Sequence, residues 1–227
     1  MNNTEISVIL PCLNEETTVG YCIDEIKEFF ERNNINGEII LVDNACTDAS
    51  ADVALSHGAN VVKEEKRGYG YAIRKGLENA TGKYLMIGDC DTTYNFKELG
   101  LMYDLLKDGN ADMVIGNRFL GNTEKGAISF SHRYGVKFLS LVARLKFHTD
   151  VVDFHCGLRG LTSEAYKTLS FHSGGMEFAT EMIAEAARKK LKIAQFPVAL
   201  RKSKYERESK LRTIRDGFRH LHYILCS

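Results

Sequence analysis

The amino-acid sequence predicts an α/β fold in which a mostly parallel central sheet carries helices on both faces. Through about residue 116, short apolar runs alternate with segments of helical spacing. This alternation is typical of strand–helix–strand units, whose buried strands read as continuous apolar runs. The chain has 227 residues, which suffices for one sizeable core and is short for two full domains. We therefore expect a single domain over residues 1–227.

The expected strands are short apolar runs bounded by turn-forming or polar residues. Pro11 closes the first run, and Thr81-Gly82 turns the chain into the fourth. In chain order the expected strands are Ile6–Leu10, Glu38–Val42, Asn60–Val62, Tyr84–Ile87, Met113–Ile115 and Lys192–Pro197.

The expected helices carry apolar residues at spacings of three and four, as in the first one at Val19, Cys22, Ile23, Ile26, Phe29 and Phe30. We expect a cap near Thr47 to begin the second helix and Gly58 to stop it. In chain order the expected helices are Glu16–Asn33, Thr47–Ser56, Tyr69–Asn79, Phe96–Leu106, His132–Phe147, Met176–Lys190 and Arg212–Cys226. Gly121–Ser131 is expected to be a loop that orders on binding, in the manner of an active-site lid.

The composition is that of a soluble globular protein, with 44% hydrophobic and 26% charged residues. Thirty basic residues balance thirty acidic ones, so the global charge offers no argument for a nucleic-acid partner. The six cysteines form no C-x-x-C pair, which argues against a disulfide framework or a zinc site and favours small buried thiols in a reducing cytoplasm. The polar N-terminus lacks the features of a signal peptide, and no apolar run approaches the roughly 20 residues of a membrane helix.

Polar clusters follow several of the expected strands. Ligands of open α/β sheets bind beyond the carboxyl ends of the strands, so these clusters are the candidate functional residues. They are Pro11–Glu16, Asp43–Asp48, Asp89–Thr93 and Gly116–Arg118.

The strongest local signal is Gly88-Asp89-Cys90-Asp91 at the end of an apolar strand. Two carboxylates one residue apart can converge on a hard cation, and oxygen ligands suit Mg²⁺ or Mn²⁺. Mg²⁺ is usually shared between one or two carboxylates and substrate phosphates. The alternative is a pair of solvated turn aspartates that cap the next helix.

The loops after the first two strands supply further candidates. Asp43 can accept hydrogen bonds from a base or ribose, whereas Asp48 is more simply a turn or first-turn helix residue. Asn14 can cap the helix that follows it. Glu15 and Glu16 are stabilised by the helix dipole if they lie in its first turn. If Glu15 binds a ligand, it meets donors on the base or ribose, because two acids would repel phosphate.

The segment Lys66–Ala72 combines glycines with cations. It is not a dinucleotide fingerprint, because Ile73 stands at the last glycine position and the segment does not follow the first strand. The glycines still permit close backbone approach to a ligand, and Lys66 and Arg67 can neutralise phosphate.

Several enzyme classes are excluded by missing motifs. The sequence has no H-E-x-x-H, no G-x-S-x-G and no P-loop motif, which argues against a zinc protease, a serine hydrolase and a P-loop enzyme. A sugar nucleotidyltransferase favours a glycine-rich N-terminal loop, and Ile6–Glu16 contains no glycine. A non-catalytic sugar-nucleotide-binding module stays an alternative that metal-dependent turnover would exclude.

Basic residues gather near the C-terminus, at Arg201, Lys202, Lys204, Arg207, Lys210, Arg212, Arg215 and Arg219. With Phe218, Leu221, Tyr223, Ile224 and Leu225 they form an amphipathic basic end. This end either contacts a membrane surface or docks on the domain with a solvated face.

The order of these motifs resembles family 2 glycosyltransferases of the GT-A fold. The resemblance is strong over residues 5–118, which would bind the nucleotide sugar, and leaves residues 119–227 as an acceptor-binding half. The second half resembles the polyprenyl-phosphate (dolichol-phosphate) mannosyl- and glucosyltransferases. The supporting pieces are Gly116–Phe119, Asp153–Arg159, Met176–Glu181, Phe196–Val198 and Glu208–Leu211.

The resemblance implies a role for each matching residue. In the nucleotide-sugar site, Pro11, Leu13 and Glu15 contact the nucleoside, Asp43 reads the base, and Asn14, Arg67 and Gly68 complete the site. Asp89 and Asp91 hold the diphosphate through Mg²⁺ or Mn²⁺. Arg118, Arg159, Arg207 and Lys210 meet the acceptor phosphate or the departing diphosphate.

The chain departs from the family pattern in two places. The usual pair of aspartates after the second strand is Asp43-Asn44 here, and Thr93 stands where related mannosyltransferases have a glutamine. The donor therefore stays open between the UDP-glucose and GDP-mannose types.

The resemblance implies an inverting displacement, and its acceptor decides whether a base is needed. A polyprenyl phosphate is largely ionised at pH 7, because its second pKa is near ~6, so positioning by Arg and Lys would suffice. A saccharide hydroxyl, the alternative acceptor, needs a general base, for which Asp153 and Glu177 are the candidates.

We expect a cytoplasmic protein, peripheral at a membrane, that touches the bilayer through its terminal helix and the His132–Phe147 helix.

Overall fold

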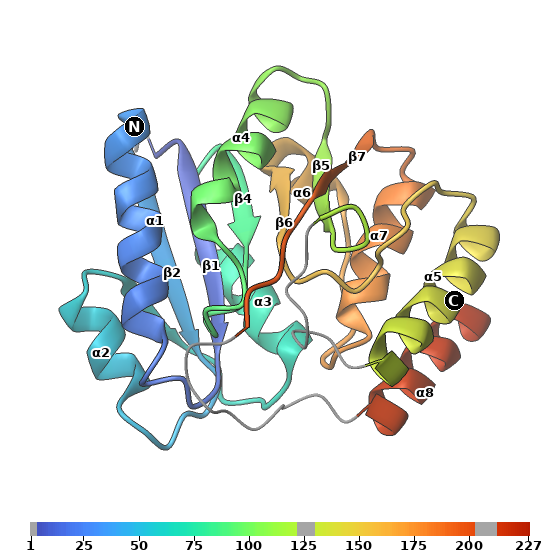
Figure 1. Cartoon of the computed structure of the whole chain (residues 1–227), viewed down its shortest axis with the longest axis horizontal. Coiled ribbons are helices and arrows are strands. Elements are labelled where there is room, and N and C mark those ends of the chain that lie inside the picture. The colour runs from blue at the N-terminus through green and yellow to red at the C-terminus, as the bar shows by residue number, and fades with distance from the viewer. Residues whose placement is uncertain (1–3, 122–129, 203–212) are drawn as a thin grey trace.

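The computed structural model describes residues 4–121, 130–202 and 213–227. Seven strands form one sheet in the order β3-β2-β1-β4-β6-β5-β7 (Figure 1). The strands are β1 (Ile6–Cys12), β2 (Gly37–Asp43), β3 (Asn60–Lys63), β4 (Tyr84–Ile87), β5 (Met113–Asn117), β6 (Arg159–Thr162) and β7 (Ile193–Pro197). The helices are α1 (Val19–Asn33), α2 (Ser50–Ser56), α3 (Tyr69–Asn79), α4 (Leu99–Lys107), α5 (Phe130–Phe147), α6 (Ser163–Thr168), α7 (Phe178–Arg188) and α8 (Thr213–Cys226), with a 3-10 turn, η1, at Phe96–Glu98.

The sheet is mostly parallel, as predicted. Only β6 runs against its neighbours among the described strands, pairing antiparallel with both β4 and β5. β6 and α6 were not predicted. Arg159 and Gly160 interrupt the apolar pattern of β6, which is four residues long.

Helices cover both faces of the sheet. On β6, Gly160 lies against Met102 and Leu106 of α4, whereas the preceding Arg159 points to α7, where it donates to the Ala179 carbonyl. Gly76 of α3 packs on Ile9 of β1. Because α3 contacts α7 and α4 lies beside α1, one layer contains α1 and α4 and the other α3 and α7.

The first strand runs one residue beyond Pro11, where we expected it to end. Pro11 pairs with Val42 and Cys12 with Asp43 in the parallel ladder with β2. The Cys12 carbonyl accepts the Asn44 N–H on the β2 side. Successive residues of a strand direct their backbone groups to opposite sides, so the backbone groups of Pro11 face the β4 side. Pro11 lies beyond Ile9, the last β1 residue that pairs with β4. Its missing N–H is not needed there.

Helix boundaries differ most near the N-terminal loops. α1 begins at Val19, not at Glu16, and α2 begins at Ser50, not at Thr47. The start of α2 is held by Asp48, whose carboxylate accepts both the N–H and the hydroxyl of Ser50. Gly58 follows α2 with a φ of 87° and ends it as predicted.

The later boundaries hold more closely. α3 and β4 match their expected bounds, and the expected helix from Phe96 is split into η1 and α4. Residues 122–129 of the expected lid loop lie outside the described residues, and α5 begins at Phe130. None of the described helices is long and apolar enough to cross a bilayer.

The core consists of the strand side chains and the inner faces of the helices. Phe96, Phe154 and Phe178 are fully buried within it. Four of the six cysteines are buried, whereas Cys46 is half-buried and Cys226 is exposed. The expectation of buried thiols is therefore wrong for Cys226, which lies on the outer face of the last helix.

Candidate active site

The polar loops that follow the strands meet at one edge of the sheet. The Asn14 carboxamide oxygen accepts the Thr47 N–H at 2.8 Å, which ties the loop after β1 to the loop after β2. The Thr18 hydroxyl donates to the Cys90 carbonyl at 2.8 Å, which ties the same loop to the turn after β4. Three of the predicted clusters thus form one connected surface at the carboxyl ends of β1, β2 and β4.

Asp91 lies in a tight turn that fixes its carboxylate. It is buried, and one oxygen accepts the Thr93 N–H at 2.9 Å and the Thr93 hydroxyl at 2.5 Å. The intervening Thr92 has a left-handed φ of 64°, a conformation that is uncommon outside glycine and frequent at functional turns. Thr93, which stands where related mannosyltransferases have a glutamine, therefore orients Asp91.

Asp89 lies against the backbone of Gly157. A Cβ at Gly157 would approach an Asp89 carboxylate oxygen to 2.3 Å, so any larger residue would displace the carboxylate. Among the described residues no group of three or more His, Cys, Asp and Glu side chains could hold a metal by itself. Two carboxylates with hard oxygen donors fit Mg²⁺ or Mn²⁺ when substrate phosphates supply further ligands.

Asp43 and Glu15, the residues predicted to contact a nucleoside, lie at the end of β2 and in the loop after β1. One Asp43 carboxylate oxygen accepts the Cys46 N–H at 2.8 Å, and the side chain is half-buried. Glu15 is buried, its N–H donates to the Ser50 hydroxyl, and one carboxylate oxygen accepts the Thr18 hydroxyl. Their contacts with a nucleoside stay a prediction.

Asn14 and the two glutamates do not form the first turn of a helix, as one sequence interpretation had them. Because α1 starts at Val19, the dipole of that helix does not explain Glu15 and Glu16. Asn14 adopts a left-handed φ of 54° and binds Thr47 across the site in place of capping α1.

Asn44 explains one departure from the family pattern. Its buried side-chain amide donates to the carbonyls of Glu64 and Lys66 and accepts the Gly68 N–H, at 3.0, 2.8 and 2.8 Å. An ionised aspartate only accepts hydrogen bonds and could not make the first two. Asn44 therefore holds the loop before α3.

Gly68 is needed for a contact within the protein. A Cβ on Gly68 would lie 2.1 Å from the Gly174 carbonyl oxygen, and its N–H is taken by Asn44. Glycine at this position therefore permits the close approach of the loop before α7, and the predicted approach of a ligand to Gly68 stays a prediction. Arg67 beside it is exposed, and its contact with phosphate stays a prediction.

Arg118 forms a buried ion pair with Asp153. Its Nε and Nη2 donate to the two carboxylate oxygens, each at 2.7 Å, and its backbone N–H donates at 3.1 Å. Burial disfavours the guanidinium charge, but Asp153 outweighs this effect and raises the pKa of Arg118. Arg118 thus occupies both Asp153 oxygens, and one of them also accepts the His155 N–H.

Arg159 has a different environment from the one predicted. It is 1% exposed, and it donates to the carbonyls of Cys156, Ala179 and Phe154 at 2.8 to 2.9 Å. We therefore correct the expectation that it touches phosphate: its donors hold the Phe154–Gly157 turn against α7. Arg207 and Lys210, the other predicted phosphate contacts, lie outside the described residues.

Two tyrosines near Asp89, Tyr69 and Tyr94, were not predicted as site residues. Tyr94 is buried, and its hydroxyl accepts the Gly157 N–H at 2.8 Å. Burial raises the pKa of both Tyr69 and Tyr94, and the Asp89 carboxylate adds to the effect. Both phenols are therefore neutral at the site. The sequence could have indicated them as site residues, because Tyr69 follows Gly68 and Tyr94 comes three residues after Asp91.

A second polar cluster lies between α7 and α8, in the part of the chain predicted to bind the acceptor. Glu177 pairs with Arg219 at 2.8 Å, and its other carboxylate oxygen is buried with no hydrogen-bond partner among the described residues. The Thr180 hydroxyl lies 2.8 Å from His220 Nδ1, and the His155 ring meets the His220 ring edge-on. Burial lowers the pKa of His220 to about 4.

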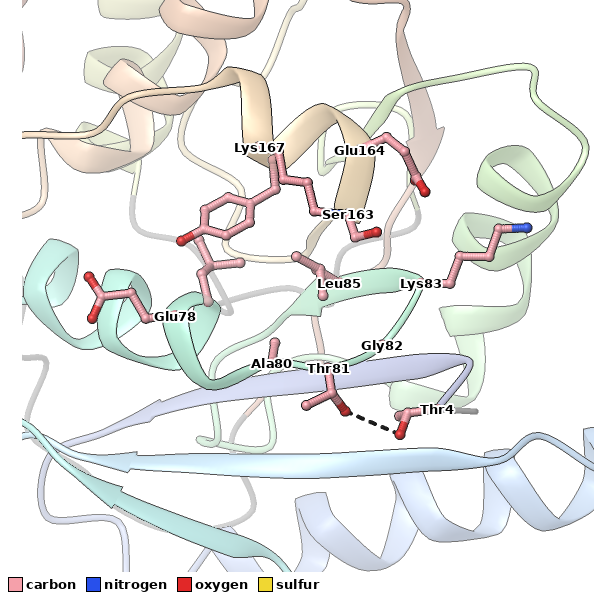
Figure 2. A pocket seen from close by; sticks show the side chains of 12 residues that line it. Thr4, Glu78, Ala80, Thr81, Gly82, Lys83, Leu85, Ser163, Glu164 and Lys167 are labelled. Carbon is pink, nitrogen blue, oxygen red and sulfur yellow. Dashed lines mark hydrogen bonds between the residues drawn. The ribbon is translucent and has the colours of Figure 1, made fainter. Parts of the chain in front are cut away.

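Two cavities open on the described part of the protein, and one of them lies beside the cluster of Glu177 and Arg219. One of about 540 Å³ lies between the loop before α7 and α8, lined by Ser173, Glu177, Phe218, Arg219, His222 and Tyr223. Another, of about 630 Å³, is lined by Thr4, Lys83 and Ser163 (Figure 2). The second lies at the amino ends of β1 and β4, away from Asp89, so it is not the candidate active site.

Comparisons with known proteins agree with this geometry. Residues 7–170 match the model of glycosyl transferase family 2. The chain is 35% identical to the low-salt glycan biosynthesis hexosyltransferase Agl6 of Haloferax volcanii, over 98% of this chain and 53% of that protein. It is 27% identical to the dolichyl-phosphate beta-glucosyltransferase ALG5D of Trichomonas vaginalis, over 85% of this chain and 64% of that protein. The chain thus spans about half to two thirds of the length of these two relatives.

Solved structures show the same fold. Glucosyl-3-phosphoglycerate synthase from Mycobacterium tuberculosis, in complex with Mn²⁺, UDP-glucose and phosphoglyceric acid, superposes with a TM-score of 0.77 at 20% identity. The match covers 98% of this chain and 79% of that one. The predicted GT-A fold is confirmed.

Proposed function

The chain belongs to glycosyl transferase family 2, and we propose that it transfers a hexose, with inversion, from a nucleotide diphosphate sugar to a polyprenyl phosphate at a membrane surface. The donor is of the UDP-glucose or GDP-mannose type. Agl6 acts in glycan biosynthesis and ALG5D on a dolichyl phosphate, by their names, and both activities are compatible with this reaction.

The donor would bind across the carboxyl ends of β1, β2 and β4. Asp43 and Glu15 would meet the nucleoside with Pro11 and Leu13, and Asp89 and Asp91 would hold Mg²⁺ or Mn²⁺ beside the diphosphate. A bound divalent ion supplies positive charge where the leaving diphosphate gains negative charge. Thr93 and Gly157 keep the two carboxylates in place.

The carboxylates of the acceptor half favour an acceptor that needs no base. Asp153 is fully buried and bound by Arg118 through both oxygens, so it is not available to take a proton. Glu181 is also buried, and both its oxygens accept backbone N–H groups. An ionised phosphate attacks without losing a proton, and this arrangement suits it.

One observation carries the lipid part of the proposal: the outer face of α5 is apolar and basic. Tyr134, Phe138, Leu141 and Leu145 are 52% to 70% exposed and follow one another at spacings of three and four, so they form one stripe. The opposite face, with Val136, Ser140, Ala143 and Phe147, is buried.

The charges around the stripe complement an anionic surface. α5 contains no acidic residue, and Lys137 and Lys146 are exposed beside the stripe. α8 packs against α5 (Figure 1), and two of its own apolar residues, Phe218 and Leu225, are 69% and 63% exposed. A helix pair with an apolar outer face and flanking cations is typical of proteins that lie on anionic membranes.

A release assay tests the proposed function. The protein is incubated with Mn²⁺ or Mg²⁺, a short-chain polyprenyl phosphate and a panel of UDP- and GDP-sugars, and nucleoside diphosphate release is measured. We expect release with one donor class, dependent on the metal and lost in Asp91→Asn. Asp104→Asn, an exposed aspartate on α4, is the matched control. Equal rates in the two variants would contradict the metal role of Asp91.

A saccharide hydroxyl is the alternative acceptor, and Glu177 is then the base to examine. Its second oxygen is buried and has no hydrogen-bond partner among the described residues. Under our proposal, Glu177→Gln retains turnover to within about tenfold, because no proton is removed. A loss of several orders of magnitude would favour the hydroxyl acceptor.

A further inference from the structure

The segment Lys66–Tyr71 borders the proposed donor site and is held from both halves of the protein. It leads from β3 into α3. From the donor half, Asn44 binds it through the Lys66 carbonyl and the Gly68 N–H. The position of its cations and of Tyr69 relative to Asp89 therefore depends on what fixes this backbone.

From the acceptor half, the loop before α7 binds the start of α3. The Gly174 carbonyl accepts the N–H groups of Gly70 and Tyr71 at 3.1 and 3.3 Å. These are first-turn amides, which have no partner within their own helix. The contact is also tight, because a Cβ on Gly70 would lie 2.4 Å from the Ser173 carbonyl oxygen.

The loop before α7 is itself fixed by Glu181. This side chain lies in the first turn of α7 and is 2% exposed. Its two carboxylate oxygens accept the N–H groups of His172 and Ser173, each at 2.9 Å. Charge-assisted hydrogen bonds of this kind are about twice as strong as neutral ones. Glu181 thus determines where Gly174 meets α3.

We propose that Glu181 is a positioning residue for the nucleotide diphosphate donor, although it belongs to the acceptor half. It acts through the His172–Gly174 loop on the first turn of α3, and so on the Lys66–Tyr71 segment. This inference rests on the proposed function, because it assumes a donor at the edge of β1, β2 and β4. It adds a residue whose effect is on donor binding.

The test measures nucleotide binding without any acceptor. Mn²⁺ with UDP, and separately with GDP, is titrated into the full chain by calorimetry. Glu181→Gln keeps the shape of the side chain but replaces one acceptor oxygen by an NH₂ group, so one of the two amide contacts is lost. We expect the nucleotide affinity to fall about tenfold.

A second variant approaches the same contact from the other side. Gly70→Ala places a methyl group against the Ser173 carbonyl, and we expect a similar loss of affinity. Because both variants act through one contact, their double variant should lose less than the product of the two effects. Glu185→Gln, one turn later on α7 and paired only with Arg188 among the described residues, is the matched control.

Hydrogen exchange separates positioning from a local structural role. In Glu181→Gln we expect faster exchange at the Gly70 and Tyr71 amides as well as at His172 and Ser173. Exchange that rises only at His172 and Ser173, or a nucleotide affinity within about twofold of wild type, would overturn the inference. If Glu181→Gln does not fold, Gly70→Ala decides by the same two readouts. Wild-type protein that binds neither nucleotide would refute the proposed function itself, and this inference with it.

Discussion

Residues 5–118, the proposed donor half, and the described residues after 118, the proposed acceptor half, differ in the chemistry of the contacts that stabilise them. In the donor half, several contacts between loops are neutral hydrogen bonds, such as Asn14 to Thr47 and Asn44 to Gly68. In the acceptor half, buried charges hold the structure: Arg159 donates to three carbonyls, Glu181 accepts two amides, and Asp153 binds Arg118 at the end of the donor half. We therefore expect the loss of one partner to cost more at these buried charges than at the neutral contacts of the donor half.

The largest expected effect comes from the buried ion pair. Asp153→Asn leaves the Arg118 guanidinium buried without its counter-charge, which should cost about 3–5 kcal/mol of the free energy of unfolding. Urea denaturation measures it, with the exposed Asp150→Asn as control. A loss below about 1 kcal/mol would mean that solvent reaches the pair and that the comparison between the halves is wrong.

The exposed apolar residues give the next effect. Phe138→Ser with Leu145→Ser should weaken binding to vesicles of phosphatidylcholine and phosphatidylglycerol at least about tenfold, because two apolar side chains no longer enter the bilayer. The control is Leu101→Ser in the donor half, a residue that is 52% exposed on α4. Equal binding by wild type and the double variant in flotation experiments would remove the argument for a membrane-facing acceptor half.

A pH dependence follows from His220. Its folded pKa of about 4 lies below the ordinary value of 6.5, so the unfolded chain binds more protons between these values. The stability that this residue contributes is present above pH 6.5 and is lost as the pH falls toward 4. Between pH 7 and pH 4.5 we expect a loss of about 2 kcal/mol from this group.

Comparing wild type with His220→Gln isolates that contribution from other titrating groups. Urea denaturation at the two pH values should give a smaller pH dependence in the variant. Identical pH dependence in both proteins would show that His220 is solvated and that α8 does not pack as described.

The smallest effect tests the donor half. Asn44→Asp restores the usual family residue but removes two donors to the Glu64 and Lys66 carbonyls, which should cost about 1 to 2 kcal/mol. The exposed Asn110→Asp is the control in the same denaturation assay. A more stable Asn44→Asp protein would show that Asn44 is not needed to hold this loop.

The two halves also differ in which elements the sequence predicts, because the unpredicted β6 and α6 both lie in the acceptor half. α3 and β4 in the donor half match their expected bounds, because apolar periodicity and turn residues act locally. β6 was missed because half of it is Arg159 and Gly160, whose places are set by contacts with α7 and α4. Periodicity does not reveal such long-range contacts.

The same distinction applies to the site. The Asp89 and Asp91 turn was recognisable from two carboxylates after an apolar run, and the structure places it at the edge that the fold requires. The partners of these residues were not recognisable, since Gly157 reaches Asp89 from far along the chain. Arg159 was misassigned for a related reason: a sequence shows a cation, but not that three carbonyls surround it.

The most direct test of the central claim compares two acceptors that differ in one group. Nucleoside diphosphate release is measured with a short-chain polyprenyl phosphate and with the matching polyprenol, at equal concentration and with the same donor and metal. We predict release with the phosphate and only background release with the alcohol, because an ionised phosphate attacks without losing a proton whereas Asp153, which is bound by Arg118 through both oxygens, is not available to take one from a hydroxyl. Release with a sugar or polyprenol hydroxyl, but none with the phosphate, would contradict the account.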